Sequence, residues 1–248
     1  MIMKTLKLCC LITVLSSIAT FSQAQSEESQ MAYQAYLNNN NGLWKQLVKR
    51  CETNYVNDSS LENLYQLALA QHGLLNASLI DQDEDLFDAY LETTKDNLEK
   101  LISSEHEPGN SRALLSSIYG MEMSYSSWKG MFLGAKSSKN MEKALKIAPN
   151  SPMVWQIRGI SKLFTPSMFG GDKQEALTAL KKAIELYEGA SPLPQSNWRY
   201  IDAYAWLGQC YQKLEKTEEA RSTYHKALVL EPDFNWIKYG LLPKLNAN

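Results

Sequence analysis

The feature that most constrains this 248-residue sequence is a spacing of small residues near its C-terminus. In the run IDAYAWLGQCYQKLEKTEEARSTYHKALVLEPDF, Ala220 follows Gly208 after 12 residues, and apolar side chains recur every three or four positions around both. That periodicity predicts two helices joined by a short turn. Antiparallel helices approach to about 8 Å only where their contact carries small side chains, so Gly208 and Ala220 are expected at the contact. Pro232 then ends the second helix.

Two further copies of this spacing lie upstream, and both have longer turns. Gly159 and Ala176 are 17 residues apart, and Ser116 and Ser137 are 21 apart. Compared with the regular 12, the turns contain insertions of five and nine residues. Each pair of helices therefore keeps its contact positions while its turn is enlarged.

The remaining sequence also has a helical pattern. Before residue 110, apolar residues spaced by three and four predict two more helix pairs, near 27–56 and 60–104, the first acting as an end cap. The closing run FNWIKYGLLPKL is expected to lay Trp236, Tyr239 and Leu242 over the last pair. The expected fold is all-α, a solenoid of about five helical hairpins with a C-terminal capping helix.

The quoted run resembles a tetratricopeptide (TPR) repeat, which has aromatic, Leu-Gly, Ala and Pro positions over 34 residues. Eight residues match that pattern in register: Tyr204, Leu207, Gly208, Tyr211, Ala220, Tyr224, Ala227 and Pro232.

A second run, VWQIRGISKLFTPSMFGGDKQEALTALKKAIELYE, is similar to the family of exported TPR-like proteins that includes the T component of TRAP transporters. The resemblance covers roughly 112–230. It implies an all-helical exported protein that associates with a substrate-binding protein and has a lipophilic central pore.

The N-terminus has the pattern of a cleaved signal peptide. Lys4 and Lys7 precede an apolar run over 8–19, and Ser22-Gln23-Ala24 gives the small-x-small cleavage pattern. The expected organisation is a signal peptide at 1–24, a diverged helical region at 25–109, and TPR-like repeats with the cap at 110–248. The apolar run is too short for a permanent membrane anchor. Export is expected, with the periplasm as the compartment, although the same signal also serves release outside the cell.

The residues that usually carry chemistry are sparse. The three histidines are isolated from one another, and no cysteine pair has the spacing of a zinc site. The 25 basic and 27 acidic residues leave no basic stripe for nucleic acid. Cys51 and Cys210, at opposite ends of the array, are expected to be buried free thiols. We expect no enzyme activity, no metal and no cofactor.

The two enlarged turns are rich in methionine and aromatic residues, and both lie on the same edge of the predicted solenoid. Two interpretations follow. Either the turns pack on each other as a small core, or they wall a pocket for an apolar ligand or for a segment of a partner. The candidate ligand-binding residues are Tyr125, Trp128, Met131, Phe132, Phe164, Met168 and Phe169.

The first helices of a TPR-like array line its concave groove. Candidate groove residues are Met153, Gln156, Ile160, Asp202, Gln209 and Lys213, and an ordinary solvated inner face is the alternative. Two functional hypotheses result. The first is a scaffold that binds a protein partner, such as a substrate-binding protein, through the groove and the inserted loops. The second is a carrier of small apolar ligands associated with a transport system.

Overall fold

The computed structural model describes residues 27–190 and 196–247, so the signal peptide expected at 1–24 lies outside the described part. This part is helical and forms no strand. After a first helix at 27–37, the helices are α2 (Asn41–Asn57), α3 (Leu61–Asp81), α4 (Glu84–Ser103), α5 (Pro108–Tyr125), α6 (Gly130–Ile147), α7 (Pro152–Phe164), α8 (Lys173–Glu188), α9 (Trp198–Lys213), α10 (Thr217–Leu230) and α11 (Leu242–Ala247). Short 3₁₀ turns, η1 (Ser127–Lys129) and η2 (Ser167–Phe169), lie within the two enlarged turns, and a π-helical turn, η3 (Trp236–Leu241), precedes α11.

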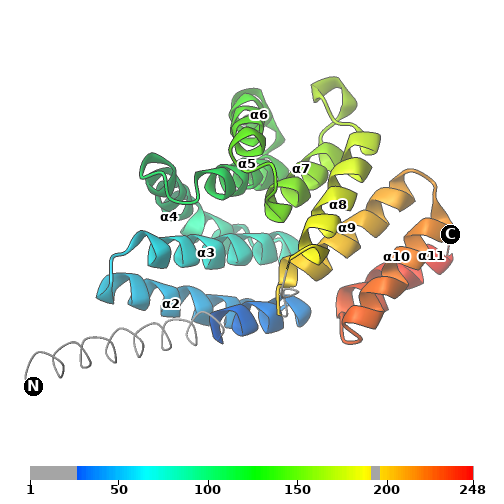
Figure 1. Cartoon of the computed structure of the whole chain (residues 1–248), viewed down its shortest axis with the longest axis horizontal. Coiled ribbons are helices and arrows are strands. Elements are labelled where there is room, and N and C mark those ends of the chain that lie inside the picture. Colours follow the sequence, from blue (N-terminus) through cyan, green and yellow to red (C-terminus); the bar gives the residue numbers. More distant parts are fainter. Residues whose placement is uncertain (1–26, 191–195, 248) are drawn as a thin grey trace, which may run out of the picture.

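Neighbouring helices pack as hairpins stacked in sequence order, which confirms the predicted helical-hairpin solenoid (Figure 1). Small residues lie at the contacts as expected. A Cβ atom on Gly208 would lie 2.1 Å from the Tyr224 ring, and one on Gly159 would lie 2.6 Å from the Leu180 side chain. In the α5–α6 pair the contact is polar, because Ser116 Oγ donates to the carbonyl oxygen of Ser137 at 2.9 Å.

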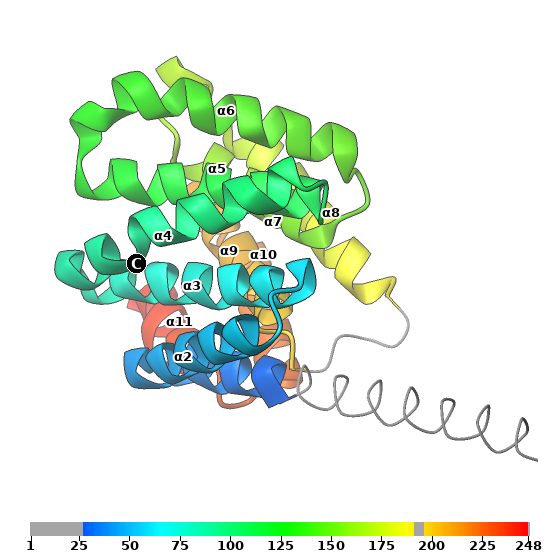
Figure 2. The ribbon, with the colours of Figure 1, turned by 90° about the vertical axis from the view of Figure 1, so that its left-hand side faces the viewer.

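The array also closes on itself, because the helix at 27–37 packs against the last pair and the C-terminal segment (Figures 1 and 2). The Tyr36 ring lies 4.9 Å from Trp198 and 5.6 Å from Phe234, measured between centroids. The Tyr36 hydroxyl donates to Asp202 Oδ1 at 2.6 Å. The first pair therefore does not cap an open end of the array but joins its two ends.

The C-terminal segment covers the last pair as predicted, and Trp236 and Leu242 are half-buried against its core, but Tyr239 takes no part. Phe234, Ile237 and Leu241 are buried, whereas the Tyr239 side chain is 71% exposed. The π-helical turn changes the register of this segment, so the expectation for Tyr239 is wrong. Cys51 and Cys210 are buried free thiols, as expected.

Candidate functional site

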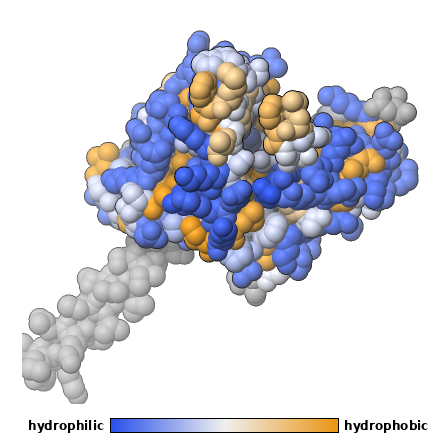
Figure 3. Space-filling view, turned by 90° about the horizontal axis from the view of Figure 1, so that it is seen from above, coloured by the Kyte–Doolittle hydropathy of each residue, from blue (hydrophilic) through white to orange (hydrophobic). Residues whose placement is uncertain are grey.

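The enlarged turns project as two exposed apolar loops, which we call the apolar loops and define as residues 127–132 and 164–169. Their large side chains are mostly in solvent: Trp128 63%, Met131 77%, Phe132 62%, Phe164 52%, Met168 83% and Phe169 71% exposed. The interpretation that the turns pack on each other as a small core is therefore wrong. Figure 3 shows them as two neighbouring apolar projections on one face of the molecule.

Tyr125 differs from the other predicted ligand-binding residues because it is held within the fold. Its hydroxyl donates to the carbonyl oxygen of Ser78 at 3.0 Å, and its ring lies 4.8 Å from the Phe87 ring. It anchors the base of the first apolar loop rather than pointing into solvent.

The second apolar loop is shaped by its backbone. Gly170 adopts φ 89°, a left-handed conformation that glycine accepts readily. A Cβ atom on Gly171 would lie 1.7 Å from the carbonyl oxygen of Thr165, so only glycine fits there. Asp172 accepts from the backbone N–H groups of Gln174 and Glu175, which lowers the pKa of its carboxyl and caps α8. The loop is thus closed by specific contacts that leave Met168 and Phe169 outside.

One predicted groove region is filled rather than open. Of the six candidate groove residues, Met153, Gln156 and Asp202 are buried. Asp202 accepts hydrogen bonds from Gln156 Nε2 at 2.7 Å and from Trp206 Nε1 at 3.0 Å, besides the one from Tyr36. The expectation of an open groove is wrong for Gln156 and Asp202, whose side chains are hydrogen-bonded within the fold, Asp202 to Tyr36 of the first helix. Met153 is buried in the core formed by α3 to α7 and reaches the cavity described below. Ile160 and Gln209 are half-buried, and Lys213 is exposed beside Phe164, with its Nζ 5.3 Å from the ring centroid.

Burial also changes the ionisation of Asp202. The loss of hydration raises the pKa of its carboxyl to about 6, although the hydrogen bond from Tyr36 and the charge of Arg199 act in the opposite direction.

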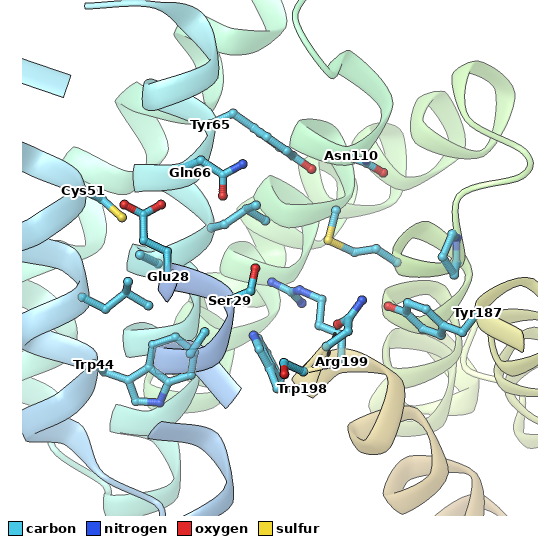
Figure 4. A pocket seen from close by; sticks show the side chains of 18 of the residues that line it. Glu28, Ser29, Trp44, Cys51, Tyr65, Gln66, Asn110, Tyr187, Trp198 and Arg199 are labelled. Atoms are coloured by element: carbon cyan, nitrogen blue, oxygen red, sulfur yellow. Dashed lines mark hydrogen bonds between the residues drawn. The ribbon is translucent and has the colours of Figure 1, made fainter. Parts of the chain in front are cut away.

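A cavity of about 430 Å³ lies at the centre of the closed array, where the helix at 27–37, α2, α3 and the starts of α5, α7 and α9 come together. Figure 4 shows lining side chains from these elements facing a common opening. Its main aromatic, apolar and charged lining residues are Trp44, Tyr65, Met153, Tyr187, Trp198 and Arg199. Sequence reasoning identified only Met153 among them. The adjacent Trp198 and Arg199 at the start of α9 were the available signal.

Arg199 carries the positive charge of this cavity. Its side chain is almost fully buried, with 8% of the residue exposed, and its guanidinium lies 4.4 Å from the centroid of the Trp198 ring. Its Nη2 donates to His72 Nδ1 at 3.1 Å, while His72 Nε2 contacts Ser117 Oγ at 3.1 Å. Burial and the charge of Arg199 lower the pKa of His72 well below its usual range, so the imidazole is neutral.

Two classes of site were not found in the described residues. No group of three or more His, Cys, Asp or Glu side chains there is arranged to hold a metal ion. No helix within the described ranges has the length and apolar character needed to cross a membrane.

Comparison with known proteins identifies the class of the fold. Residues 201–234 match the tetratricopeptide repeat family model, and the helical hairpins stacked around this repeat give the described part of the chain a TPR-like fold. The structure is similar to the HusA haemophore from Porphyromonas gingivalis, with TM-score 0.61 and 20% identity over 76% of this chain and 93% of that one. It is also similar to a thermophilic TPR protein from Thermus thermophilus, with TM-score 0.58 and 18% identity over 88% of this chain and 98% of that one. No curated protein matches the sequence.

Proposed function

We propose that this protein is an exported, periplasmic scaffold that binds a protein partner through its two apolar loops. A TPR-like fold is typically a non-enzymatic framework for protein–protein contacts. The observation that carries the proposal is the exposure of six large apolar side chains on two neighbouring loops, because contiguous apolar surface on a soluble protein usually marks an interaction site.

Of the candidate groove residues, only Lys213 is exposed beside this apolar surface. Lys213 lies against Phe164, and Phe164 packs edge-on against Trp206 with ring centroids 5.4 Å apart. The second apolar loop is therefore continuous with the exposed end of α9. The resemblance to the T component of TRAP transporters makes a substrate-binding protein the proposed partner.

Site-specific photo-cross-linking in the native cells tests this proposal. A benzophenone analogue of phenylalanine replaces Phe132 or Phe169, and in the matched control it replaces Tyr239, an equally exposed aromatic residue of the C-terminal segment. Both loop positions should give the same discrete cross-linked polypeptide, and the control should not. The proposal fails if the loop positions give no product or if the product forms equally well from Tyr239.

A second candidate function is the carriage of a small apolar ligand for a transport system. The central cavity favours it, since ligand sites commonly have volumes of about 300–1,000 Å³ and aromatic linings. The HusA protein, which has a similar fold, is a haemophore. Because six of the seven predicted ligand-binding residues are more than half exposed, a ligand on the loops would remain largely in water. We therefore place the carrier site in the cavity.

Native mass spectrometry of the protein isolated from its own cells without detergent tests the carrier function. A retained mass of a few hundred daltons should disappear in Ser29→Trp, which places a bulky side chain at the cavity wall. Gln34→Trp is the control, because Gln34 is exposed on the same helix. A protein that carries no such mass, or loses it equally in both variants, contradicts the carrier proposal.

A further inference from the structure

The central cavity contains a buried cation that the described residues leave without a close counter-ion. No carboxylate among them lies within 4 Å of the Arg199 guanidinium. Among the described residues its guanidinium makes one hydrogen bond, to a neutral imidazole, which uses one of the five N–H groups of a guanidinium. A buried charge is costly unless it is paired, so this arrangement requires an explanation.

The nearest acidic groups have other partners. Both oxygens of Asp202 accept hydrogen bonds from neutral donors, namely Tyr36, Gln156 and Trp206. Glu28 also lines the cavity, but its Oε1 accepts from Asn54 Nδ2 at 2.7 Å and lies 3.7 Å from Arg50 Nε. In Figure 4 Glu28 lies beside Cys51, whereas Arg199 lies beside Trp198, toward Tyr187. The cavity therefore has an acidic end held by Arg50 and a basic end where the Asp202 carboxyl acts on the Arg199 charge only through space, without an ion pair or hydrogen bond to it.

Arg199 is also held in position before any ligand arrives. His72 fixes one nitrogen of the guanidinium, the Trp198 ring lies against it, and Asn197 caps the start of α9. The N-terminus of α9 adds a partial positive charge at the same place. A side chain that is ordered in advance loses little entropy on binding, which favours affinity.

The lining residues around Arg199 indicate the chemical character of the rest of the ligand. Tyr65, Met153 and Trp198 offer aromatic and apolar surface, while Asn110 and Ser151 add polar groups at the α5 and α7 helix starts. One buried cation matches one negative charge, and the planar guanidinium fork matches a carboxylate. A phosphate carries a charge of about −1.5 to −2 at neutral pH, so this single cation would leave part of it uncompensated.

We infer that the cavity binds a small carboxylic acid, with the carboxylate on Arg199 and an apolar or aromatic body against Tyr65, Met153 and Trp198. The inference rests on the carrier function proposed for this cavity and specifies its ligand class. It concerns a different site from the apolar loops.

The test compares two fluorescent probes that share one aromatic body, 4-(1-pyrenyl)butyrate and 4-(1-pyrenyl)butanol, by pyrene anisotropy with the full mature protein. Loss of a hydrogen bond to a charged group usually weakens binding by about 10- to 100-fold. We expect the acid to bind tighter than the alcohol by that factor. In Arg199→Gln the preference should fall to about 1, and Arg199→Lys should retain part of it. Arg158→Gln, which removes a guanidinium outside the cavity lining, should keep it.

The possible results separate the ligand class from the carrier function. Equal binding of acid and alcohol to the unsubstituted protein, or an unchanged preference in Arg199→Gln, overturns the carboxylate inference and leaves the carrier function standing. If neither probe binds, both are rejected. Circular dichroism checks that Arg199→Gln remains helical, and if it does not fold, the unsubstituted protein and Arg199→Lys decide the outcome.

Discussion

The apolar loops and the interior around Arg199 have opposite relations to water. In the loops, Met168 and Phe169 are large apolar side chains held in solvent, whereas in the interior Arg199 and Asp202 are charged or titratable side chains held away from it. Both arrangements are unfavourable for an isolated chain. A partner placed over the loops would cover their apolar side chains, and an anionic ligand inside the cavity would pair with the charge of Arg199. The two regions are therefore proposed to bind different kinds of partner.

The largest expected effect concerns the contact that closes the interior. Tyr36→Ala removes the ring packed on Trp198 and Phe234 and the hydrogen bond to Asp202, so it should lower the free energy of unfolding by about 3–4 kcal/mol. Tyr239→Ala, which shortens an exposed tyrosine, should change it by less than about 0.5 kcal/mol. Urea unfolding followed by circular dichroism measures both. Similar losses in the two variants would show that the array does not depend on this closure.

A second prediction uses the titration of Asp202. Its pKa is about 6 in the folded protein and near 3.8 in the unfolded chain, so between these values the folded state binds the extra proton. The free energy of unfolding should therefore fall as the pH rises from about 4 to 7, by about 3 kcal/mol from this group.

Asp202→Asn provides the reference for that titration, because an amide does not ionise in this range. As the pH rises from about 4 to 7, the unsubstituted protein should lose stability relative to Asp202→Asn. A difference that stays constant from pH 4 to 7 would mean that Asp202 is not buried in solution.

These comparisons also show what the sequence could predict. The pairing of helices depends on the local spacing of residues. The close contact of Gly208 with the helix that carries Tyr224, and the positions of both enlarged turns, could therefore be predicted from the sequence. The contact by which Tyr36 closes the array could not be predicted, since it joins residues 166 positions apart and no repeat pattern encodes it. The cavity depends on the same closure, so Arg199 was not selected as a binding residue.

The composition of the turns predicted their chemistry but not their environment. Methionine and aromatic residues suit both a small core and an exposed docking surface. Gly170, Gly171 and the cap at Asp172 fold the second loop outward, and that geometry decides between the two interpretations.

A smaller effect is expected where the apolar surface meets the fold. Phe164 is 52% exposed but packs edge-on against Trp206 and lies beside the Lys213 ammonium. Phe164→Ala should lower the free energy of unfolding by about 1 kcal/mol, from the lost aromatic contact and partial burial. Thermal and urea unfolding measure the change. A loss above about 3 kcal/mol would place Phe164 in the core rather than at the base of a docking surface.

The smallest effect on stability is expected at the tips of the apolar loops. Phe132→Ser and Phe169→Ser remove side chains that are mostly exposed, so each should change the free energy of unfolding by less than about 0.5 kcal/mol. With the photo-reactive residue placed in the other loop, each of these variants should abolish capture of the partner, which separates binding from folding. If these substitutions destabilise the protein as strongly as Tyr36→Ala does, the loops belong to the core in solution. The contrast between exposed apolar loops and a polar interior would then be lost, together with the argument for a docking surface.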